Sequence, residues 1–393
     1  MVKFRNALIL FAAVAGFVPC VAPVSARGYA ASHAAAFAKG RDALEAWFRA
    51  NTGPKIALTK SFTGTFEVRS QADADRLTGT LVSGRVVIFA SHVALGNFAV
   101  SGAKRDPAVY DYAVLPADTV IDGDYDGRRY RKELLRAGRA DPRVPGAVAK
   151  ERALAAMWTP LLSVVNGASH IVIRDFRIDG NDERIYSGMG GTSRSLHVTV
   201  ERGEIVRTGD DGAKQFTRST FRHCYIHDLR PWKHESDGPF YSGPNNSRYP
   251  HLDPLQATRG DRNLIEGNWL ENSYTSTATA GGNLVKPDEG QNITRYTMRR
   301  NYMAGGNNYV AHFLNQSGVL DPRGGATVKG IVIRDNLIGR PPAGMRPGAQ
   351  GQAAKTPKSP FSAPLYADQI RFSGNVWADT REPVPLPLLP TRP

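Results

Sequence analysis

Three short segments of the sequence bring together side chains that donate and accept protons. The segments are GDDGAK at 209–214, HLDPLQ at 251–256 and VKPDEG at 285–290, and their polar residues are Asp210, Asp211, Lys214, His251, Asp253, Gln256, Lys286 and Asp288. Two carboxyl groups can share the acid and base roles in the hydrolysis of a glycosidic bond. A lysine or histidine can instead remove the proton next to a carboxylate and begin a β-elimination. The residue types leave both reactions open.

Each reaction selects a different set of residues. Hydrolysis would use Asp210, Asp211 and Asp253. Elimination would use Lys286 as the base, or a histidine, since imidazole titrates close to neutrality. Arg295 would then neutralise the substrate carboxylate. A third interpretation is a network of polar side chains that only stabilises turns.

A fourth segment, PWKHESDGPFY at 231–241, combines aromatic and charged side chains. Trp232 and Tyr241 can stack on sugar rings, whereas Lys233 and His234 can contact a carboxylate. The alternative is a surface loop whose aromatic residues pack on one another.

One segment matches the spacing of a calcium loop. IDGDYDGRRYRKE at 121–133 places acidic residues in the order D-x-D-x-D-G-x5-E, with Asp122, Asp124, Asp126 and Glu133 as the oxygen ligands. The lead-in YAVLPADTVI contains a proline and is strand-like rather than helical, and Ile-Asp-Gly recurs at 178–180 as an ordinary turn. We expect no cofactor to be required, with calcium at this loop as the alternative.

These segments must be positioned by short strands, because β-branched runs separated by Gly, Asn and Asp turns recur along most of the chain. Six of them share one pattern, in which a turn residue follows an apolar strand and precedes another apolar or aromatic residue. The shared slot is occupied by Phe176, Cys224, Asn268, Asn301, Asn336 and Asn375. Repeats of this size with β character predict stacked coils. Asparagines in one register predict a ladder, since each amide can donate to one neighbouring coil and accept from the other. In that slot Cys224 is expected to be a buried structural thiol rather than a nucleophile.

The same alignment predicts a row of polar side chains. Asp253 and Lys286 each lie 15 residues before an asparagine of the slot, and Asp211 lies 13 residues before Cys224. Stacking would place the three about 5 Å apart in sequence order. HLDPLQ is then expected to be a strand whose alternate side chains face a groove, with Asp253 in the middle.

The repeats HIVIRDFRIDG, NLIEGNWLENS, NITRYTMRRNYMAGG and KGIVIRDNLIG resemble the right-handed parallel β-helix superfamily of pectate-lyase-like proteins, over roughly residues 88–379. HLDPLQ followed by GDRNLIEGNWLEN is similar to a secreted subfamily with a His-x-Asp-x-x-Gln segment. The resemblance implies the architecture, but lyases, hydrolases, epimerases and phage tailspikes share it. The GHG and RIK motifs of polygalacturonase-type hydrolases are absent.

The beginning of the chain predicts export. Residues 1–26 have a basic start, an apolar run and a small-residue end, which is typical of a signal peptide cleaved near Ala26. Its removal would take away two of 50 basic residues and no acidic ones, so the formal charge of +14 would fall to about +12. A charge of this sign favours a polyanionic partner. It would also leave Cys224 as a lone cysteine, which excludes a disulfide framework.

The sequence therefore predicts an all-β, right-handed parallel β-helix with an N-terminal capping helix and long loop insertions. The expected organisation is a signal peptide at 1–26, a segment with the capping helix at 27–60, the β-helix at 61–380 and a Pro-rich tail at 381–393. The leading hypothesis for function is a secreted or periplasmic lyase of an acidic polysaccharide. The alternatives are a glycoside hydrolase or C5-epimerase, and a non-catalytic binding or surface-assembly protein. We expect a monomer with no membrane span and no nucleic-acid partner.

Overall fold

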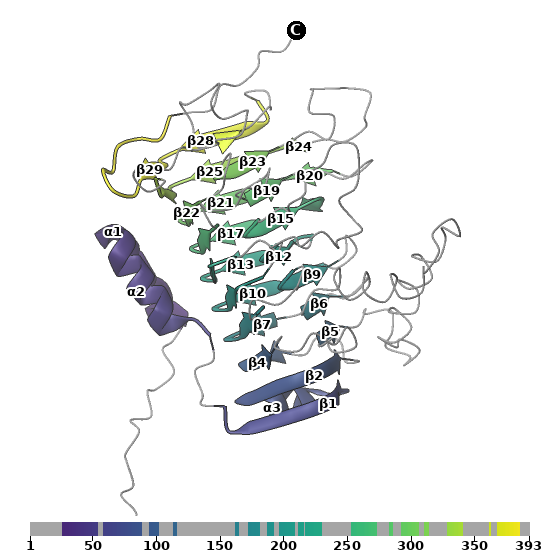
Figure 1. Ribbon diagram of the computed structural model, residues 1–393. Helices are drawn as coiled ribbons and strands as arrows, with labels where there is room; N and C mark the ends of the chain where they lie inside the picture. Colours follow the sequence, from purple (N-terminus) through teal and green to yellow (C-terminus); the bar gives the residue numbers. More distant parts are fainter. Residues whose placement is uncertain are drawn as a thin grey trace, which may run out of the picture.

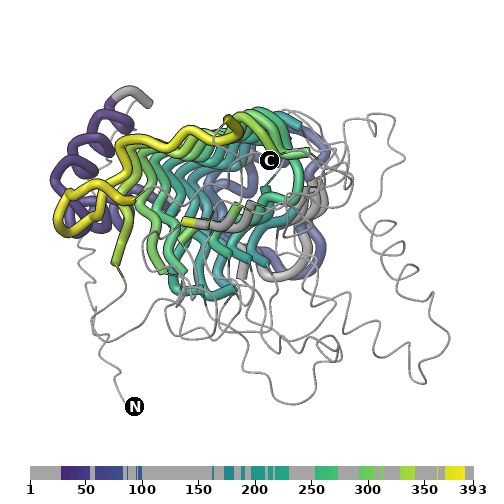
Figure 2. Tube along the Cα trace, turned by 90° about the horizontal axis from the view of Figure 1, so that it is seen from above, coloured from purple at the N-terminus to yellow at the C-terminus, as the bar shows by residue number. Residues whose placement is uncertain are grey.

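The chain forms a stack of short parallel strands. The computed structural model describes residues 26–53, 58–88, 94–101, 113–115, 162–164, 172–180, 187–191, 196–208, 211–215, 217–229, 253–272, 283–285, 292–305, 310–313, 328–340, 361–362 and 368–385. Every ladder between its named strands is parallel, and strands of one coil pair with those of the next (Figure 1). Seen along the stack, the coils lie nearly on top of one another (Figure 2). The predicted all-β parallel β-helix is therefore confirmed.

Three long runs of strands and one short run form the walls. The eight-stranded sheet contains β3 (Ala94–Leu95), β7 (Val172–Arg174), β10 (Thr199–Glu201), β13 (Thr220–Arg222), β17 (Leu264–Glu266), β21 (Thr297–Arg299), β25 (Ile331–Arg334) and β28 (Ile370–Ser373). The second run contains β1 (Lys60–Val68), β2 (Thr80–Ile88), β4 (Phe98–Ser101), β8 (Arg177–Asp179), β11 (Glu204–Val206), β14 (Tyr225–His227), β18 (Trp269–Glu271), β22 (Tyr302–Ala304), β26 (Leu337–Ile338) and β29 (Val376–Trp377).

The third run begins on the second half of β2 and contains β5 (Ala113–Leu115), β6 (Leu162–Val164), β9 (Met189–Gly191), β12 (Ala213–Lys214), β15 (Leu255–Ala257), β19 (Asn283–Val285), β23 (Ala311–Phe313) and β27 (Phe361–Ser362). The short run contains β16 (Gly260–Asp261), β20 (Ile293–Thr294) and β24 (Val328–Lys329). A complete coil passes from the third run through the short run to the eight-stranded sheet, and then to the second run.

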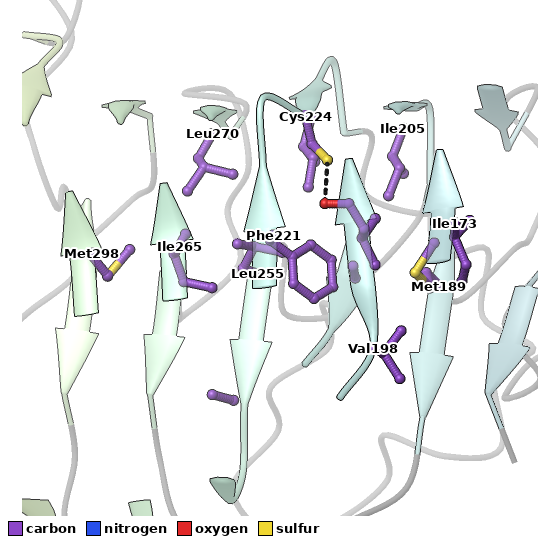
Figure 3. Close-up of a cluster of buried hydrophobic side chains, with 14 of the residues drawn as sticks. Ile173, Met189, Val198, Ile205, Phe221, Cys224, Leu255, Ile265, Leu270 and Met298 are labelled. Atoms are coloured by element: carbon purple, nitrogen blue, oxygen red, sulfur yellow. Dashed lines mark hydrogen bonds between the residues drawn. The ribbon is translucent and has the colours of Figure 1, made fainter. Parts of the chain in front are cut away.

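The core fills the inside of the coils. In the eight-stranded sheet the central residue of each three-residue strand is buried while its neighbours are mostly more exposed, as in β13, where Phe221 is buried and Arg222 is exposed. Successive coils stack these apolar residues on one another; Figure 3 shows Phe221 near Ile265 and Met298 in neighbouring strands. A three-residue strand buries little surface alone, so its stability depends on the coils on either side.

The turn between the eight-stranded sheet and the second run has the same backbone geometry on seven successive coils. The residue before the slot has a positive φ in every one, and these residues are Asp175, Arg202, His223, Gly267, Arg300, Asp335 and Gly374. A left-handed residue turns the chain sharply and leaves the next residue, the slot, pointing into the coil.

The asparagine ladder fills this slot as predicted. Asn301 accepts hydrogen bonds at Oδ1 from the backbone N–H (2.9 Å) and the side-chain amide (3.0 Å) of Asn268. Its own Nδ2 donates to Ile265 O and to Asn336 Oδ1, both at 3.0 Å. All four ladder asparagines are buried, with at most 2% exposure. Each amide therefore satisfies backbone groups of two coils that water cannot reach.

Cys224 continues the ladder with a thiol. Each asparagine donates to the carbonyl of a central residue in the eight-stranded sheet one coil earlier, and the Cys224 Sγ lies 3.6 Å from Val200 O, the equivalent carbonyl (Figure 3). Burial raises the pKa of this thiol to about 12. The prediction of a buried structural cysteine is confirmed.

One coil was missed by the sequence alignment. Gly203 occupies the slot between Phe176 and Cys224, and the segment HVTVERGEIV supplies its strands β10 and β11. A Cβ on Gly203 would lie 2.1 Å from the Phe176 ring, so the slot is a glycine because the neighbouring coil has an aromatic residue there.

The N-terminal helix differs from the prediction in number and place. One capping helix within 27–60 was expected, but Gly40, with φ 120°, separates α1 (Ala26–Lys39) from α2 (Arg41–Asn51). The two helices are joined by a hydrogen bond in which Trp47 Nε1 donates to the Ser32 hydroxyl at 3.0 Å. The two helices lie along the side of the stack, not over its open end (Figure 1). The expected capping role is wrong because the apolar face matches a different surface.

That surface is a file of outward-facing aromatic residues on the second run, Tyr225, Trp269 and Tyr302, which we call the aromatic file. The Trp269 and Tyr302 rings stack with centroids 3.9 Å apart. Phe48 of α2 contacts both Tyr225 and Trp269, with centroids 5.7 and 6.1 Å away. Burying such rings against a helix stabilises both elements.

The end of the stack is covered by a helix that the sequence pattern did not reveal. α3 (Gln71–Leu77) follows β1, begins with a Ser70 side chain that accepts from Asp73 N, and buries Ala74 and Leu77 in the main core. It contacts β3, the first strand of the eight-stranded sheet, and lies at the level of β1 and β2 (Figure 1). No helix among the described residues is long and apolar enough to cross a membrane.

Replacing one ladder asparagine should destabilise the whole stack. Asn301→Ala removes four hydrogen bonds and leaves the buried Asn268 N–H without an acceptor, so the free energy of unfolding should fall by about 3 kcal/mol. Asn51→Ala, which removes one hydrogen bond to Trp47 O at a helix end, is the control. Equal losses in denaturant unfolding would contradict a special role for the ladder.

Acid should loosen the helices from the stack. His33 and His223, with ring centroids 4.8 Å apart, lie between α1 and the coils. Burial lowers the pKa of His33 to about 3 and that of His223 to about 4. Between pH 6.5 and 4 both histidines are neutral in the folded protein, whereas in the unfolded chain they take up a proton. The free energy of unfolding should therefore fall as the pH drops from 6.5 towards 4, by about 1–2 kcal/mol for each histidine at pH 5. Trp47 fluorescence checks this; the double variant His33→Leu/His223→Leu should lose the dependence, and retention would contradict it.

Candidate functional site

Three four-residue segments lie in register at the beginnings of three adjacent strands of the third run, β9, β12 and β15. They are SGMG at 187–190, DGAK at 211–214 and DPLQ at 253–256, aligned because Ala213 pairs with both Met189 and Leu255. The first position of each segment is polar and buried, and the residues there are Ser187, Asp211 and Asp253. The strand register therefore stacks Asp211 on Asp253, as the sequence alignment predicted.

Each aspartate contacts the fourth residue of its own segment. Lys214 Nζ lies 3.5 Å from Asp211 Oδ2, and Gln256 Nε2 donates to Asp253 Oδ2 at 3.4 Å. Lys214 in turn pairs with Gln256 across the ladder. The four side chains form a square. We call Asp211 and Asp253 the carboxyl pair, and Lys214 and Gln256 its two partners. Lys214 is 32% exposed, so the partners form the side of the square nearer to solvent.

The backbone of the two coils fixes this arrangement. Gly212 N donates to Asp253 O at 2.9 Å, and Gly188 N donates to Asp211 O at 3.1 Å. A Cβ on Gly212 would lie 2.6 Å from Pro254 O, and one on Gly188 would lie 2.7 Å from Gly212 O. The glycines allow the coils to approach closely at the position of the carboxyl groups.

The environment separates the two carboxyl groups electrostatically. Burial and, next, the charge of Asp211 raise the pKa of Asp253 well above its usual value, against the hydrogen bond from Gln256 and the charge of Lys214. Asp211 faces an ammonium group, whereas Asp253 faces a neutral amide. Asp253 is therefore the member whose surroundings favour the protonated form, and Asp211 is the member with a cationic partner.

Such a pair can perform general acid–base chemistry. A protonated carboxyl can donate to a leaving oxygen, and a neighbouring carboxylate can stabilise a positive centre or attack it. If Asp253 carries the proton that its raised pKa favours, the contact of Asp211 with Lys214 leaves the square without net charge. The alternative is a network of side chains that only stabilises the two coils.

Two details of the predicted row are wrong. HLDPLQ was expected to be a strand with outward side chains, but β15 begins only at Leu255, and Asp253 is 1% exposed. Lys286 was expected beside Asp253, but the preceding Val285 pairs with Ala257, four residues beyond Asp253. The connection from the third run to the asparagine slot is longer in the coil of Lys286. Two residues at the same distance in sequence from the slot are therefore not paired across the third run. Lys286 itself lies outside the described residues.

Arg295 is described, and the structure does not bring it to the carboxyl pair. It lies in the turn after β20, with Nε and Nη2 at 2.7 and 2.6 Å from the two oxygens of Asp261. The other predicted site residues lie outside the described residues; they are Asp210, Trp232, Lys233, His234, Tyr241, His251 and Asp288. The calcium loop with Asp122, Asp124, Asp126 and Glu133 lies outside them too. Within the described part of the chain, no cluster of three or more His, Cys, Asp or Glu side chains could hold a metal ion.

Of the three aligned polar residues Ser187, Asp211 and Asp253, Ser187 is the one that the sequence analysis missed. It is 1% exposed, and its hydroxyl has no hydrogen-bond partner among the described residues. The signal was present in the shared pattern of a small polar residue, then glycine or proline, then an apolar residue, which SGM, DGA and DPL all follow.

No family model matches this chain, and no curated protein matches it. Among solved structures it is similar to one titled "Crystal structure of pectate lyase Pel9A", with 12% sequence identity, a TM-score of 0.35, and coverage of 84% of this chain and 82% of that one. A likeness this remote says nothing about activity, so the fold is established by the strand register. Membership of the His-x-Asp-x-x-Gln subfamily stays a prediction.

Asp253→Asn should stabilise the protein at neutral pH. The raised pKa means that keeping Asp253 charged opposes folding, and the neutral amide has nearly the same shape. The melting temperature should rise by a few degrees at pH 7. This gain should shrink as the pH falls and vanish below 3.8, where wild-type Asp253 is protonated in both the folded and the unfolded protein. Asp42→Asn, at a side chain that is 95% exposed, should change little. A loss of stability at pH 7 would contradict the assignment of the proton.

Proposed function

We propose that this protein is a carbohydrate-active enzyme that cleaves glycosidic bonds in an acidic, uronic-acid-containing polysaccharide. The observation that carries the proposal is the carboxyl pair, with Asp211 beside Lys214 and Asp253 beside Gln256 on adjacent coils. Two carboxyl groups with unlike partners are the arrangement that hydrolysis of a glycosidic bond requires.

The partners assign the roles. Asp253 would give its proton to the glycosidic oxygen as the bond to the anomeric carbon breaks. Because both carboxyl groups are at most 1% exposed, the sugar would reach them only when the side chains that cover them move aside. Asp211 would then attack the anomeric carbon and form an ester, and water activated by the Asp253 carboxylate would release the sugar. Lys214 would hold Asp211 in position and Gln256 would orient Asp253 or a sugar hydroxyl.

The spacing of the coils favours a retaining reaction. Adjacent parallel strands lie about 4.8 Å apart. Retaining glycosidases have carboxyl groups about 5–5.5 Å apart, whereas inverting enzymes need about 6.5–9.5 Å to admit a water molecule. Residues one coil apart match the first geometry.

The charge of the chain supports an acidic substrate. The formal net charge is +14, and the carboxyl pair is compensated locally by Lys214, so the site does not repel a uronic acid. Predicted contributors next to the pair in sequence are Asp210 and His251. Predicted contacts with sugar are Trp232, Lys233, His234, Tyr241 and Asp288. Export to the periplasm or beyond, with cleavage near Ala26, is part of the proposal.

β-Elimination is the second candidate, and the basic charge together with a lysine beside the pair favours it. Lys214 Nζ lies 3.5 Å from Asp211 Oδ2, and in this proposal it holds that carboxylate in position and does not act as the base. Lys286 therefore remains the proposed base for elimination, and an absence of unsaturated product would exclude that reaction.

One screen separates the reactions. Wild-type protein is incubated with polygalacturonate, alginate and hyaluronan, and both reducing ends and the ultraviolet absorbance of unsaturated sugars are followed. We expect new reducing ends without added absorbance. Asp253→Asn and Asp211→Asn should each reduce the rate by about 10²–10⁴-fold, because each removes a group that acts in the transition state.

Asp42→Asn is the matched control, since it removes one fully accessible carboxylate and should keep full activity. Rising absorbance that needs Lys286 would show a lyase. Unchanged rates in both variants of the carboxyl pair would show that the pair is structural.

A further inference from the structure

A second charged feature lies at another corner of the stack, between the short run and the eight-stranded sheet. There Arg218, Arg262 and Arg295 have φ of 53°, 56° and 54°, and Gly330, with φ 68°, follows on the next coil. The N–H of each arginine donates to the coil above, from Arg218 to Asp261 O, from Arg262 to Thr294 O and from Arg295 to Lys329 O, at 2.8 to 3.0 Å. The three arginines, which we call the arginine file, therefore stack about 4.8 Å apart.

Arginine is an uncommon residue for this backbone geometry. A side chain at positive φ costs about 1–2 kcal/mol, which glycine avoids and asparagine reduces. Among the described residues, seven of the twelve non-glycine residues with positive φ are arginine: Arg202, Arg207, Arg218, Arg262, Arg295, Arg300 and Arg381. The backbone would favour glycine at these places, so the arginine side chains have a use that offsets the strain.

Some of these side chains join coils. Arg202 binds both oxygens of Asp175, and Arg207 binds both oxygens of Asp179, so each cation has its own carboxylate on the preceding coil. The arginine file is different, because its three guanidinium groups converge on one carboxylate.

That carboxylate is Asp261. Arg295 binds both of its oxygens, while Arg262 Nε and Arg218 Nε lie 3.5 and 3.9 Å from Oδ2. The arginine side chains are 41–58% exposed. Partial burial alone would raise the pKa of Asp261, but hydrogen bonds from Thr294 and Arg295 and the arginine charges lower it. Asp261 is therefore ionised, and the corner carries two positive charges in excess.

We propose that the arginine file binds carboxylates of an acidic polysaccharide lying along the stack, as a subsite separate from the carboxyl pair. The proposal rests on the proposed function for the class of polymer. A guanidinium group can bind a carboxylate with two parallel hydrogen bonds, and one guanidinium per coil suits a polymer with a regular series of acid groups. At Arg295 the carboxylate of the polymer would share the guanidinium group with Asp261. The strands β12 and β15 separate the file from Asp211 and Asp253, so bound polymer is held near the pair without touching it.

The surroundings favour a polysaccharide over a single-stranded nucleic acid. Sites for single strands add aromatic rings on which bases stack. Among the described neighbours of the file, Thr217, Ser219 and Thr294 are small and polar, and Tyr296 is fully buried. The described part of this corner thus supplies charge without a stacking surface.

The test compares two triple variants. Arg218→Asn/Arg262→Asn/Arg295→Asn removes the three guanidinium groups of the arginine file. Asparagine tolerates positive φ, so the chain should fold. Arg49→Gln/Arg69→Gln/Arg76→Gln removes the same charge from exposed arginines, 61–64% accessible, in α2, before α3 and in α3. Affinity for polygalacturonate, alginate, hyaluronan and an oligothymidylate is measured at low and moderate salt, and melting temperatures verify folding.

We expect the file variant to bind at least one acidic polysaccharide about tenfold more weakly than wild type, with a smaller salt dependence, while the control changes much less. Equal losses in the two variants would overturn the proposal. So would wild-type protein that binds none of the three polysaccharides, or that binds the oligothymidylate more tightly than all of them.

Turnover of the same polymers separates this proposal from the proposed function. Asp253→Asn should bind like wild type while losing turnover. File-dependent binding with no turnover by wild type would reject the enzyme and keep the file. Turnover with no effect of the file variant on affinity would reject the file alone.

Discussion

The hydrogen bonding of each coil to the next in one fixed register is the constraint on which the rest of the molecule depends. Strands of two to four residues cannot hold a register by themselves, so buried side chains at the corners hold it. The amides of Asn301, Asn336 and Asn375 accept from the buried backbone N–H groups of Asn268, Asn301 and Asn336 on the coil before, so the ladder connects successive coils. A slip of one residue between two coils would turn the buried apolar side chains of one coil towards solvent. It would also break the ladder hydrogen bonds between those coils.

The same constraint explains how two acids come to share a buried position. Asp211 and Asp253 would not approach one another through their own side chains, since like charges repel. The backbone brings them together, through Gly212 N bonded to Asp253 O and the pairing of Ala213 with Leu255. Burial and, next, that enforced closeness raise the pKa of Asp253. A rigid stack of coils can thus maintain an acid in an unfavourable environment and keep it reactive.

The parts that sequence analysis predicted are those in which the residue type is dictated by chemistry. The ladder could be predicted because only an amide donates and accepts at once, and the stacking of Asp211 on Asp253 followed from it. The alignment missed Gly203 because the residue type there is determined by the size of the Phe176 ring on the neighbouring coil. Lys286 was misaligned because the connections between runs vary in length, which counting along the chain cannot reveal. The place of α1 and α2 needed knowledge of which surface exposes Tyr225, Trp269 and Tyr302.

The position of those two helices has a consequence for the order of assembly. They lie at the beginning of the chain, yet Arg41 contacts Tyr302, and Arg381 donates to the last carbonyls of α1, 343 and 344 residues away. The Tyr302 surface does not exist until the coil of β22 has formed, and the contact with Arg381 needs the chain beyond β29. A chain that is made from its N-terminus therefore produces these helices before the coils on which they dock. The aromatic file stays incomplete until the coil of β22 is in place, and the helices gain their last contact only after β29.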